Sequence, residues 1–519
     1  MLWLGINKEA EVNMGYYEQK IPPVRDLRLR IGDAFPEGKG CDLLQCSRGG
    51  CLLGKKRSFW QANSCQMALT LMMASTVENS VIIVHGPIGC GTQLHMMDSG
   101  ARKGNVSRGK QPKPLIWLST NLRETDVIGG GEAKLLEAIE YADREFRPEI
   151  LFVVATCAPN IIGDDIEEVV KTAGETTAAT IVSLHCPGFK SRVVATAYDT
   201  FYHGLLKHLP FEPVPYKDYI PFEAADPDYE LAVKKYQYKK SHTVNLFNAT
   251  SIGPEDEKEL VRLLNALDLK VQIYAEYSSA EEIRLISQAA LNVSMCNVHD
   301  DYILEYLKKT YGIPYVIQGM PIGLKATRDW LMAIAGHFGM EERAGRLADR
   351  EEEKVLKALQ PYLPPIKDKR VLIGGGVIRV AWEAMLLEEL GMKVIGIRAY
   401  HFDNGAEPVY EVLNEELPEV PISVSNQAFE LVNQLQTLKP DLAVIHNGTN
   451  GLVAKLGIPS LQLFHVDKSF FGYRGLFDLT KRIGFAFLNS SYQRRLREHV
   501  KQPYHPEWYE KDAFSYIKE

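Results

Sequence analysis

Short runs of apolar residues alternate with amphipathic stretches along most of the chain. The segments SVIIVHG (80–86), EILFVVA (149–155) and ATIVSLH (179–185) are rich in β-branched residues and apolar on both faces. Such runs are typical of parallel strands that helices cover on both sides. Between the first two runs, EAKLLEAIEYADREF (132–146) places apolar residues three and four positions apart, which predicts an amphipathic helix.

The same alternation recurs twice further along the chain. The second block contains predicted strands at 242–248, 269–275 and 290–296 and predicted helices at 255–267 and 299–311. The third contains predicted strands at 370–376, 392–400, 441–447 and 459–465. Three rounds of β-α-β alternation predict an α/β fold of three Rossmann-like domains with parallel sheets. We expect an irregular N-terminal arm over 1–58 and domains over 59–242, 243–367 and 368–519, the last including a C-terminal extension.

Composition narrows the class of protein. The chain has 519 residues, 45% of them apolar, and a net charge of -7. This composition is ordinary for a globular protein, and a mildly acidic chain is a poor candidate for a general nucleic-acid binder, because contact with phosphates needs a basic face. The chain contains no run of about 18 consecutive apolar residues, so the sequence predicts no membrane span. Its first residues lack the features of a secretory signal. We therefore expect a cytoplasmic protein, with its eight cysteines kept as thiols.

Several possible metal ligands stand at the ends of predicted strands. Cys90, Cys157, Cys296 and His465 follow or end such strands, and Cys65 precedes a predicted helix. Ligands bind beyond the carboxyl ends of the strands in open parallel sheets. Helix starts add free N–H groups and a positive dipole, both of which suit thiolates. The glycines on both sides of Cys90 would let the backbone approach a bulky group closely.

Other interpretations of these cysteines stay open. Each could be a small buried apolar residue, and zinc is an alternative metal, although no Cys-x-x-Cys pair occurs. Cys41, Cys46 and Cys51 are spaced five apart, which matches no common metal site. Three thiols spread over 65–157 fit an iron–sulfur cluster better, and a second chain could complete its ligands. The chain has no phosphate-binding G-x-x-x-x-G-K-[ST] motif, so we expect no ATP hydrolysis by the chain itself.

Five segments together resemble one known family, the nitrogenase component 1 proteins, and specifically their α-type subunit. They are VHGPIGCG (84–91), IGGGEAKLLEAI (128–139), CAPNIIGDDIEEV (157–169), LNVSMCNVHDDYILEYLKKTYGIPY (291–315) and GIPSLQLFHVDKSFFGYRG (457–475). The resemblance runs from about residue 60 to 485 in the family's order. Each motif alone is moderately specific, and the set is highly specific.

The resemblance implies two inorganic centres and two protein partners. Cys65, Cys90 and Cys157 would hold an eight-iron P-type cluster at the interface with a homologous β-type subunit in an α2β2 heterotetramer. Cys296 and His465 would hold the two ends of a large iron–sulfur cofactor in the cleft between the domains. The sequence leaves open whether that cofactor contains molybdenum, vanadium or iron alone. An ATP-dependent iron–sulfur reductase protein would supply the electrons.

The departures from the family pattern concern the substrate pocket. Tyr198 stands where the nitrogenases have a proton-donating histidine, and Val194 where a glutamine is expected. Asp98 replaces a basic residue, and a Gly-Thr-Asn-Gly turn (448–451) replaces the lysine that helps to hold homocitrate. The cofactor ligands therefore look retained while the dinitrogen pocket does not.

These departures separate three hypotheses. A nitrogenase-like reductase that cleaves C–S bonds of small methylthio-alkanes fits best, and the resemblance, not the residue pattern, suggests that substrate. A true nitrogenase α chain lacks support in the pocket, and a cofactor-assembly scaffold would usually lack His465. Tyr198, His299 and His401 are the candidate catalytic proton donors, and the alternative for each is an ordinary packing or surface role.

Overall fold

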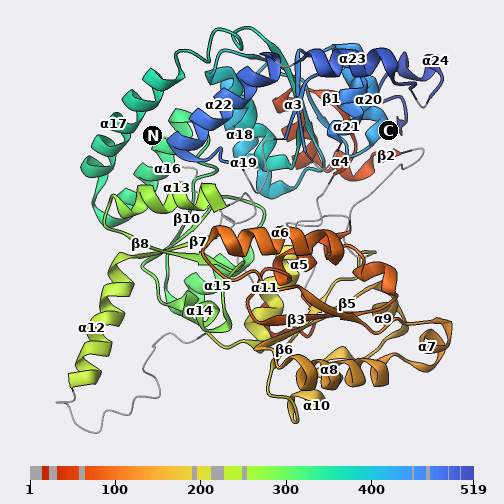
Figure 1. Ribbon diagram of the computed structural model, residues 1–519, viewed down its shortest axis with the longest axis vertical. Coiled ribbons are helices and arrows are strands. Elements are labelled where there is room, and N and C mark those ends of the chain that lie inside the picture. The colour runs from red at the N-terminus through yellow and green to blue at the C-terminus, as the bar shows by residue number, and fades with distance from the viewer. Residues whose placement is uncertain are drawn as a thin grey trace.

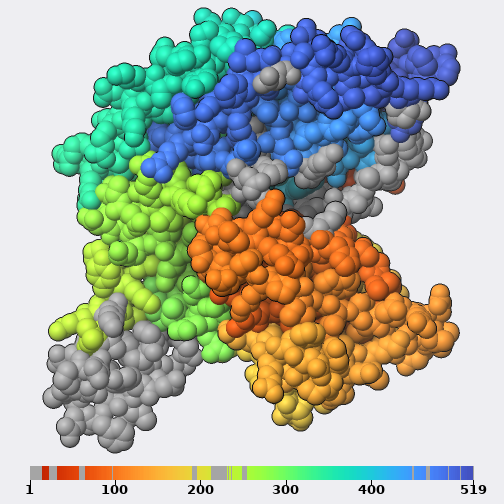
Figure 2. All heavy atoms as spheres, viewed as in Figure 1, coloured from red at the N-terminus to blue at the C-terminus, as the bar shows by residue number. Residues whose placement is uncertain are grey.

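The computed structural model describes most of the chain in three α/β domains (Figure 1). The described residues are 15–22, 32–57, 65–189, 196–211, 227–247, 254–446, 449–462, 468–488, 490–502 and 504–518. In each domain the main sheet is parallel except at one edge of the third, which confirms the predicted fold class. The first domain lies opposite the third, and the second domain joins them along one side (Figure 2).

The first domain contains a four-stranded parallel sheet in the order β4-β3-β5-β6. Helices α8 and α10 cover one face of the sheet, and α5 and α11 cover the other (Figure 1). The predicted strands and the predicted helix at 132–146 are confirmed. The elements are α5 (Gln66–Ala74), β3 (Ser80–His85), η1 (Ile88–Gly91), α6 (Leu94–Ser107), β4 (Ile116–Ser119), α7 (Glu124–Gly129), α8 (Glu132–Phe146), β5 (Ile150–Ala155), α9 (Cys157–Ile162), α10 (Ile166–Gly174), β6 (Thr180–His185) and α11 (Thr196–His208).

The second domain has a four-stranded parallel sheet in the order β10-β9-β7-β8. Strand β9 ends at Ser294 and α15 begins at Asp301, so both are shorter than predicted, and Cys296 lies in the turn between them. The elements are α12 (Pro227–His242), β7 (Thr243–Phe247), α13 (Pro254–Asn265), β8 (Lys270–Tyr274), α14 (Ala280–Arg284), β9 (Leu291–Ser294), α15 (Asp301–Tyr311), β10 (Tyr315–Ile317), α16 (Gly323–Phe338) and α17 (Glu341–Leu359).

The third domain has a six-stranded sheet in the order β1-β13-β12-β11-β14-β15, parallel except for β1. Gly376 ends the turn from β11 into α18. The elements are β11 (Arg370–Gly375), α18 (Val377–Glu389), β12 (Lys393–Ala399), η3 (Asn404–Ala406), α19 (Glu407–Glu416), β13 (Ile422–Val424), α20 (Ala428–Leu438), β14 (Leu442–Ile445), α21 (Asn450–Lys455), β15 (Ser460–Leu461), α22 (Gly472–Leu488), α23 (Ser491–His499), α24 (Pro506–Tyr509) and β16 (Ile517–Lys518).

Part of the segment expected to be an irregular arm is regular. Its elements are α1 (Gly15–Glu18), β1 (Phe35–Gly38), α3 (Gly40–Gly49), α4 (Cys51–Gly54) and β2 (Lys56–Arg57). Strand β1 pairs with β13, β2 pairs with β16, and Leu43 and Leu44 of α3 are buried in the core. The many Gly and Pro residues of this segment hid its short amphipathic helix, which tertiary packing stabilises.

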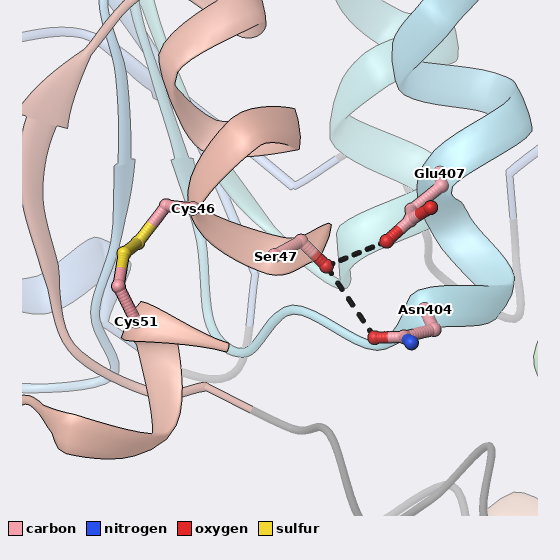
Figure 3. Close-up of a disulfide and its surroundings, with 5 residues drawn as sticks. All are labelled: Cys46, Ser47, Cys51, Asn404 and Glu407. Atoms are coloured by element: carbon pink, nitrogen blue, oxygen red, sulfur yellow. Dashed lines mark hydrogen bonds between the residues drawn. A yellow bond between two sulfur atoms is a disulfide. The ribbon is translucent and has the colours of Figure 1, made fainter. Parts of the chain in front are cut away.

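The expectation of eight free thiols is wrong for two cysteines. Cys46 and Cys51 form a disulfide across the turn between α3 and α4, where Gly50 has a positive φ (Figure 3). Next to it, the Ser47 hydroxyl donates to Glu407 over 2.7 Å (Figure 3). A separation of five residues around a tight turn brings the two sulfurs within bonding distance. The expectation of free thiols was based only on the expected cytoplasmic location and did not consider this local geometry. Cys41 is a free, exposed thiol.

Two hydrophobic cores cross the domain borders and position the site. One contains apolar side chains of α5 and α11 together with Phe247, Tyr274 and Tyr302 of the second domain. Another unites Val293 and Cys296 of the second domain with Ile373 and Val377 of the third. Burial of this shared apolar surface holds the Cys296 turn against both neighbouring domains.

Candidate metal centres

Three cysteines gather at the carboxyl edge of the first sheet. Cys90 lies in η1 directly after β3, Cys157 begins α9 directly after β5, and Cys65 precedes α5. A Cβ atom added to Gly188 would lie 2.6 Å from the Cys65 sulfur and 3.7 Å from the Cys157 sulfur. Both sulfurs therefore border the same small space, which a side chain at position 188 would fill.

The electrostatics of these thiols suit a positively charged metal group. Burial raises the pKa of Cys65 and of Cys90, and a negative charge on Cys157 would raise both further. Three neighbouring thiolates are therefore unfavourable on their own, and bound iron would offset their repulsion. Among the residues that the structure describes, no three His, Cys, Asp or Glu side chains converge on one single-ion site. Cysteine thiolates are the ligands that hold iron–sulfur clusters, so the chemistry of this donor set fits such a cluster.

A fourth cysteine lies beside this group and was not selected from the sequence. Cys186 follows β6, is 1% exposed, and is close enough to Cys65 and Cys157 for their charges to act on it. Burial raises the pKa of Cys186 to about 12, which keeps it a thiol. Its position after a third parallel strand was the signal available in the sequence.

A buried histidine–aspartate pair supports the strand ends behind the thiols. His85 closes β3 and lies 3.1 Å from Asp164 and 3.0 Å from the Thr120 hydroxyl. Burial lowers the pKa of His85, so the ring is neutral there. The Asp165 side chain caps α10, whereas Asp164 accepts a hydrogen bond from the Gly131 N–H.

The Cys296 turn lies against α11 at the border of two domains. Cys296 is 1% exposed, and the His299 ring stacks on the Tyr198 ring with centroids 4.0 Å apart. Two of the candidate proton donors are therefore brought together next to Cys296. Helix α15 begins only at Asp301, so a helical relationship between His299 and Cys296 does not exist. Burial raises the pKa of Tyr198 well above its usual value.

The third domain contributes charged residues that sequence reasoning missed. Arg379 of α18 lies within electrostatic range of Cys296, Tyr198 and Glu383, and burial lowers its pKa. One turn further along α18, the buried Glu383 lies 3.0 Å from His446, which follows β14. The i, i+4 spacing of Arg379 and Glu383 was visible in the sequence, but the side of α18 that faces the site was not.

The structure describes only some of the other predicted positions. His401 is half-buried directly after β12. His465, Val194 and Gly448 lie outside the described residues. Asp98 accepts hydrogen bonds from Arg102 and from the Leu115 N–H, which tie α6 to the chain before β4.

The chain matches a known protein family over most of its length. A family model described as nitrogenase component 1 type oxidoreductase matches residues 65–487. The chain belongs to this family. Nitrogenase component 1 proteins bind iron–sulfur clusters and form α/β complexes with an ATP-dependent reductase partner.

Among relatives, the chain is similar to a cofactor biosynthesis protein and to a nitrogenase subunit. It is 23% identical to the nitrogenase iron-molybdenum cofactor biosynthesis protein NifE of Methanococcus maripaludis, over 91% of this chain and 92% of the relative. It is 24% identical to the nitrogenase molybdenum-iron protein alpha chain of Methanothermobacter marburgensis, over 80% and 86%. The solved structure of nitrogenase Cp1 at pH 5 aligns with a TM-score of 0.67 and 19% identity, covering 86% of this chain and 92% of that one. This nitrogenase component 1 chain is therefore α-like, with the nitrogenase fold.

No helix among its described residues is long and apolar enough to cross a membrane.

Proposed function

We propose that this chain is the catalytic α-type subunit of a nitrogenase-like reductase that cleaves C–S bonds of small methylthio-alkanes. The observation that carries the proposal is the pairing of two separate cysteine sites. One is the group of Cys65, Cys90 and Cys157 at the sheet edge, and the other is Cys296, enclosed where three domains meet. A subunit that accepts electrons at its surface and uses them in its interior needs both.

The surroundings of the first group support an interface with a β-type subunit. Large apolar side chains next to the cysteine-bearing elements are exposed: Ile128 is 88%, Ile161 69%, Ile88 54% and Phe189 53% exposed. Helices α7 and α9, which carry Ile128 and Ile161, contact each other. Apolar side chains clustered in this way mark an interaction site on a protein surface. The half-buried cysteines would be enclosed by that partner.

The interior site fits a sulfide-rich cofactor. Cys296 would bind iron through its thiolate, His465 would bind the other end, and the Arg379 guanidinium would offset the negative charge of the group. When bound, this cofactor would supply electrons to the substrate at low potential. The chain's own residues would shield it from water, since the side chains of Tyr198 and Val298 near Cys296 are 2% exposed. Tyr198 and His299 stand where they could hold protons, and His401 is a further candidate.

Two arguments support the proposed substrate: the stoichiometry of its cleavage and the residues near Cys296. Cleavage of R–S–CH3 consumes two electrons and two protons and yields R–H and methanethiol. The buried side chains of Val298 and Tyr198 near Cys296 would suit an uncharged thioether, and the residues that the resemblance expects in a dinitrogen reducer are replaced. These replacements favour the C–S cleaving hypothesis over the nitrogenase hypothesis.

The experiment compares substrates under anaerobic conditions. The chain is co-expressed with its β-type and reductase partners, purified without oxygen, and analysed for iron. We expect many irons per αβ pair and ATP-dependent release of methanethiol from ethyl methyl sulfide, measured by gas chromatography. Reduction of dinitrogen or acetylene without methanethiol would instead identify a nitrogenase.

A cofactor-assembly scaffold is the second candidate, because several relatives bear the name of the biosynthesis protein NifE. A scaffold would release its cluster to a cofactor-free acceptor protein and would not turn over a substrate. Mixing the purified complex with such an acceptor and following iron transfer separates the two functions. Transfer without methanethiol formation would overturn the catalytic assignment.

A further inference from the structure

A buried carboxyl group lies four residues beyond Cys296 and joins two domains. Asp300 is 0% exposed and immediately precedes α15. Its Oδ1 accepts a hydrogen bond from the Tyr202 hydroxyl of α11 over 3.0 Å. Its Oδ2 accepts a hydrogen bond from the Ser294 hydroxyl, at the end of β9, over 2.5 Å. The carboxyl group therefore connects the first domain to the strand that leads into the Cys296 turn.

The Ser294 hydroxyl has two acceptors within reach. Asp300 Oδ2 is 2.5 Å away, and the main-chain carbonyl oxygen of Cys296 is 3.2 Å away. The same Ser294 oxygen accepts a hydrogen bond from the Cys296 N–H over 3.1 Å. A hydroxyl carries one proton and can fully serve only one acceptor at a time. The acceptor that Ser294 chooses thus depends on whether Asp300 already carries a proton.

We propose that the protonation state of Asp300 is transmitted through Ser294 to the main chain of Cys296. When Asp300 is ionised, the Ser294 hydroxyl donates to it. When Asp300 takes up one proton from solvent, it donates to the Ser294 oxygen, and Ser294 donates to the Cys296 carbonyl instead. One O–H bond forms at Asp300 and no electrons are transferred. This inference deepens the proposed function by assigning a proton-linked positioning residue to the Cys296 end of the site.

The groups around Asp300 place its charge change in the neutral range. Burial, together with the acidic Glu276 and Asp301, raises its pKa to about 7, against the lowering effect of the Ser294 and Tyr202 hydroxyls. On α11, Tyr198 lies one turn before Tyr202, and burial raises the pKa of both tyrosines well above the usual value. His299 stacks on Tyr198, and the positive charge of Arg379 on α18 partly offsets the rise in the pKa of Tyr198. The groups that shift the pKa of the Asp300 carboxyl itself are two hydroxyls and two acidic side chains.

Three variants separate the parts of this device. Asp300→Asn imitates the protonated acid, because its amide can accept from Tyr202 and donate to Ser294. Ser294→Ala leaves the carboxyl in place but removes the hydroxyl that links it to Cys296. Asp301→Asn is the matched control, since it removes the adjacent carboxylate and leaves both hydrogen bonds intact.

Infrared spectra of the full complex, prepared without its interior cofactor, test two claims. The first is that Asp300 titrates, and the second is that Ser294 transmits this change to the Cys296 carbonyl group. The protein is labelled with 13C at the carbonyl carbons of its cysteines, and the Cys296 carbonyl band is assigned by its loss in Cys296→Ala. We expect this band to shift between about pH 6 and pH 8. A protonated-carboxyl band should disappear over the same range. Asp300→Asn should lose both changes, Ser294→Ala should lose only the carbonyl shift, and Asp301→Asn should keep both.

Two results would overturn the inference. A carboxyl band that persists in Asp300→Asn would show that another acid titrates, and a carbonyl shift that persists in Ser294→Ala would show that Ser294 transmits nothing. Neither measurement needs bound cofactor or turnover. The inference can therefore fail while methanethiol formation succeeds, and the proposed function can fail while the infrared changes are observed.

Discussion

The two cysteine regions of the molecule are built in different ways. Cys90 and Cys157 follow adjacent strands of one sheet, and Cys65 joins them from the helix packed on that sheet. Around them, apolar side chains remain exposed. Cys296 instead lies in a turn that α11 and α18, from two other domains, enclose. One region is a local sheet edge open to a partner, and the other is a junction closed by the chain itself.

This difference indicates which site should depend on a partner subunit and which should depend on the packing of the chain's own domains. A site on one sheet edge keeps its geometry as long as that domain folds. A site at a junction keeps its geometry only while three domains remain packed. Disturbing the sheet edge should therefore affect assembly, whereas disturbing the junction should affect the cofactor and the coupling of domains.

The largest effect should come from removing a single thiol in each region. We expect Cys90→Ala to lose interface iron and weaken the αβ pair, and Cys296→Ala to lose cofactor iron while the pair stays assembled. Each should reduce methanethiol formation more than about 100-fold, because even indirect perturbation of metal ligands costs 10- to 100-fold. Iron analysis and gel filtration of the anaerobic complex measure both losses. Cys41→Ala, at an exposed thiol, is the control, and equal iron loss in both variants would erase the distinction between regions.

The next effect concerns the packing at the junction. Tyr198 is 2% exposed and stacks on His299, so Tyr198→Ala should cost about 3–5 kcal/mol in the free energy of unfolding. Tyr198→Phe keeps the ring and should cost less than about 1.5 kcal/mol. Urea unfolding of the purified complex measures both. A Tyr198→Phe variant that is stable but releases methanethiol more slowly would assign a proton role to the hydroxyl; unchanged turnover would remove Tyr198 from the candidate donors.

The sequence predicted the sheet-edge region well for a physical reason. Long β-branched runs such as 80–86 and 149–155 predict strands, and a residue that follows a strand is placed at the sheet edge by chain connectivity alone. The short strands β4, β10 and β13 and the N-terminal strand β1 were missed, because a few residues without a long apolar run carry little periodic signal.

The junction was only partly predictable. Cys296 was found through family resemblance, but its neighbours depend on which helix faces meet across domains. Arg379 of the third domain acts on Cys296 and Tyr198, and Asp300 of the second domain binds Tyr202 of the first, only after the three domains have packed. Periodicity in one segment contains no information about the segment that packs against it. Polar residues buried between domains are thus the class that sequence reasoning misses.

A smaller effect concerns acid sensitivity at the junction. His203 of α11 lies 2.8 Å from the Tyr302 hydroxyl and 2.9 Å from the Gln19 carbonyl oxygen, and burial lowers its pKa to about 4. The unfolded chain takes up the proton at about pH 6.5, before the folded protein does. Stability should therefore fall as the pH decreases from about 6.5 to about 4, by at most about 3 kcal/mol from this residue.

The variant His203→Gln tests this dependence, because glutamine does not titrate. It should flatten the loss of unfolding free energy over that range, as measured by urea unfolding at several pH values. His337→Gln, at an exposed position of α16, is the matched control and should leave the profile unchanged. An unchanged profile in His203→Gln would mean that the acid sensitivity resides elsewhere, with His85 at the sheet edge as the next residue to test.

The smallest effect concerns the disulfide, which lies in neither cysteine region. Closing the short loop from Cys46 to Cys51 should stabilise the fold by about 2 kcal/mol through the entropy of the unfolded chain. Replacing both cysteines by serine should therefore lower the free energy of unfolding by that amount and leave the iron content unchanged. Treatment of the wild-type protein with dithiothreitol should have the same effect as the double substitution, and Cys41→Ser should have none. If alkylation instead labels Cys46 and Cys51 in the untreated protein, all eight cysteines are thiols, and these two would have to be reconsidered as ligands beside the two regions compared above.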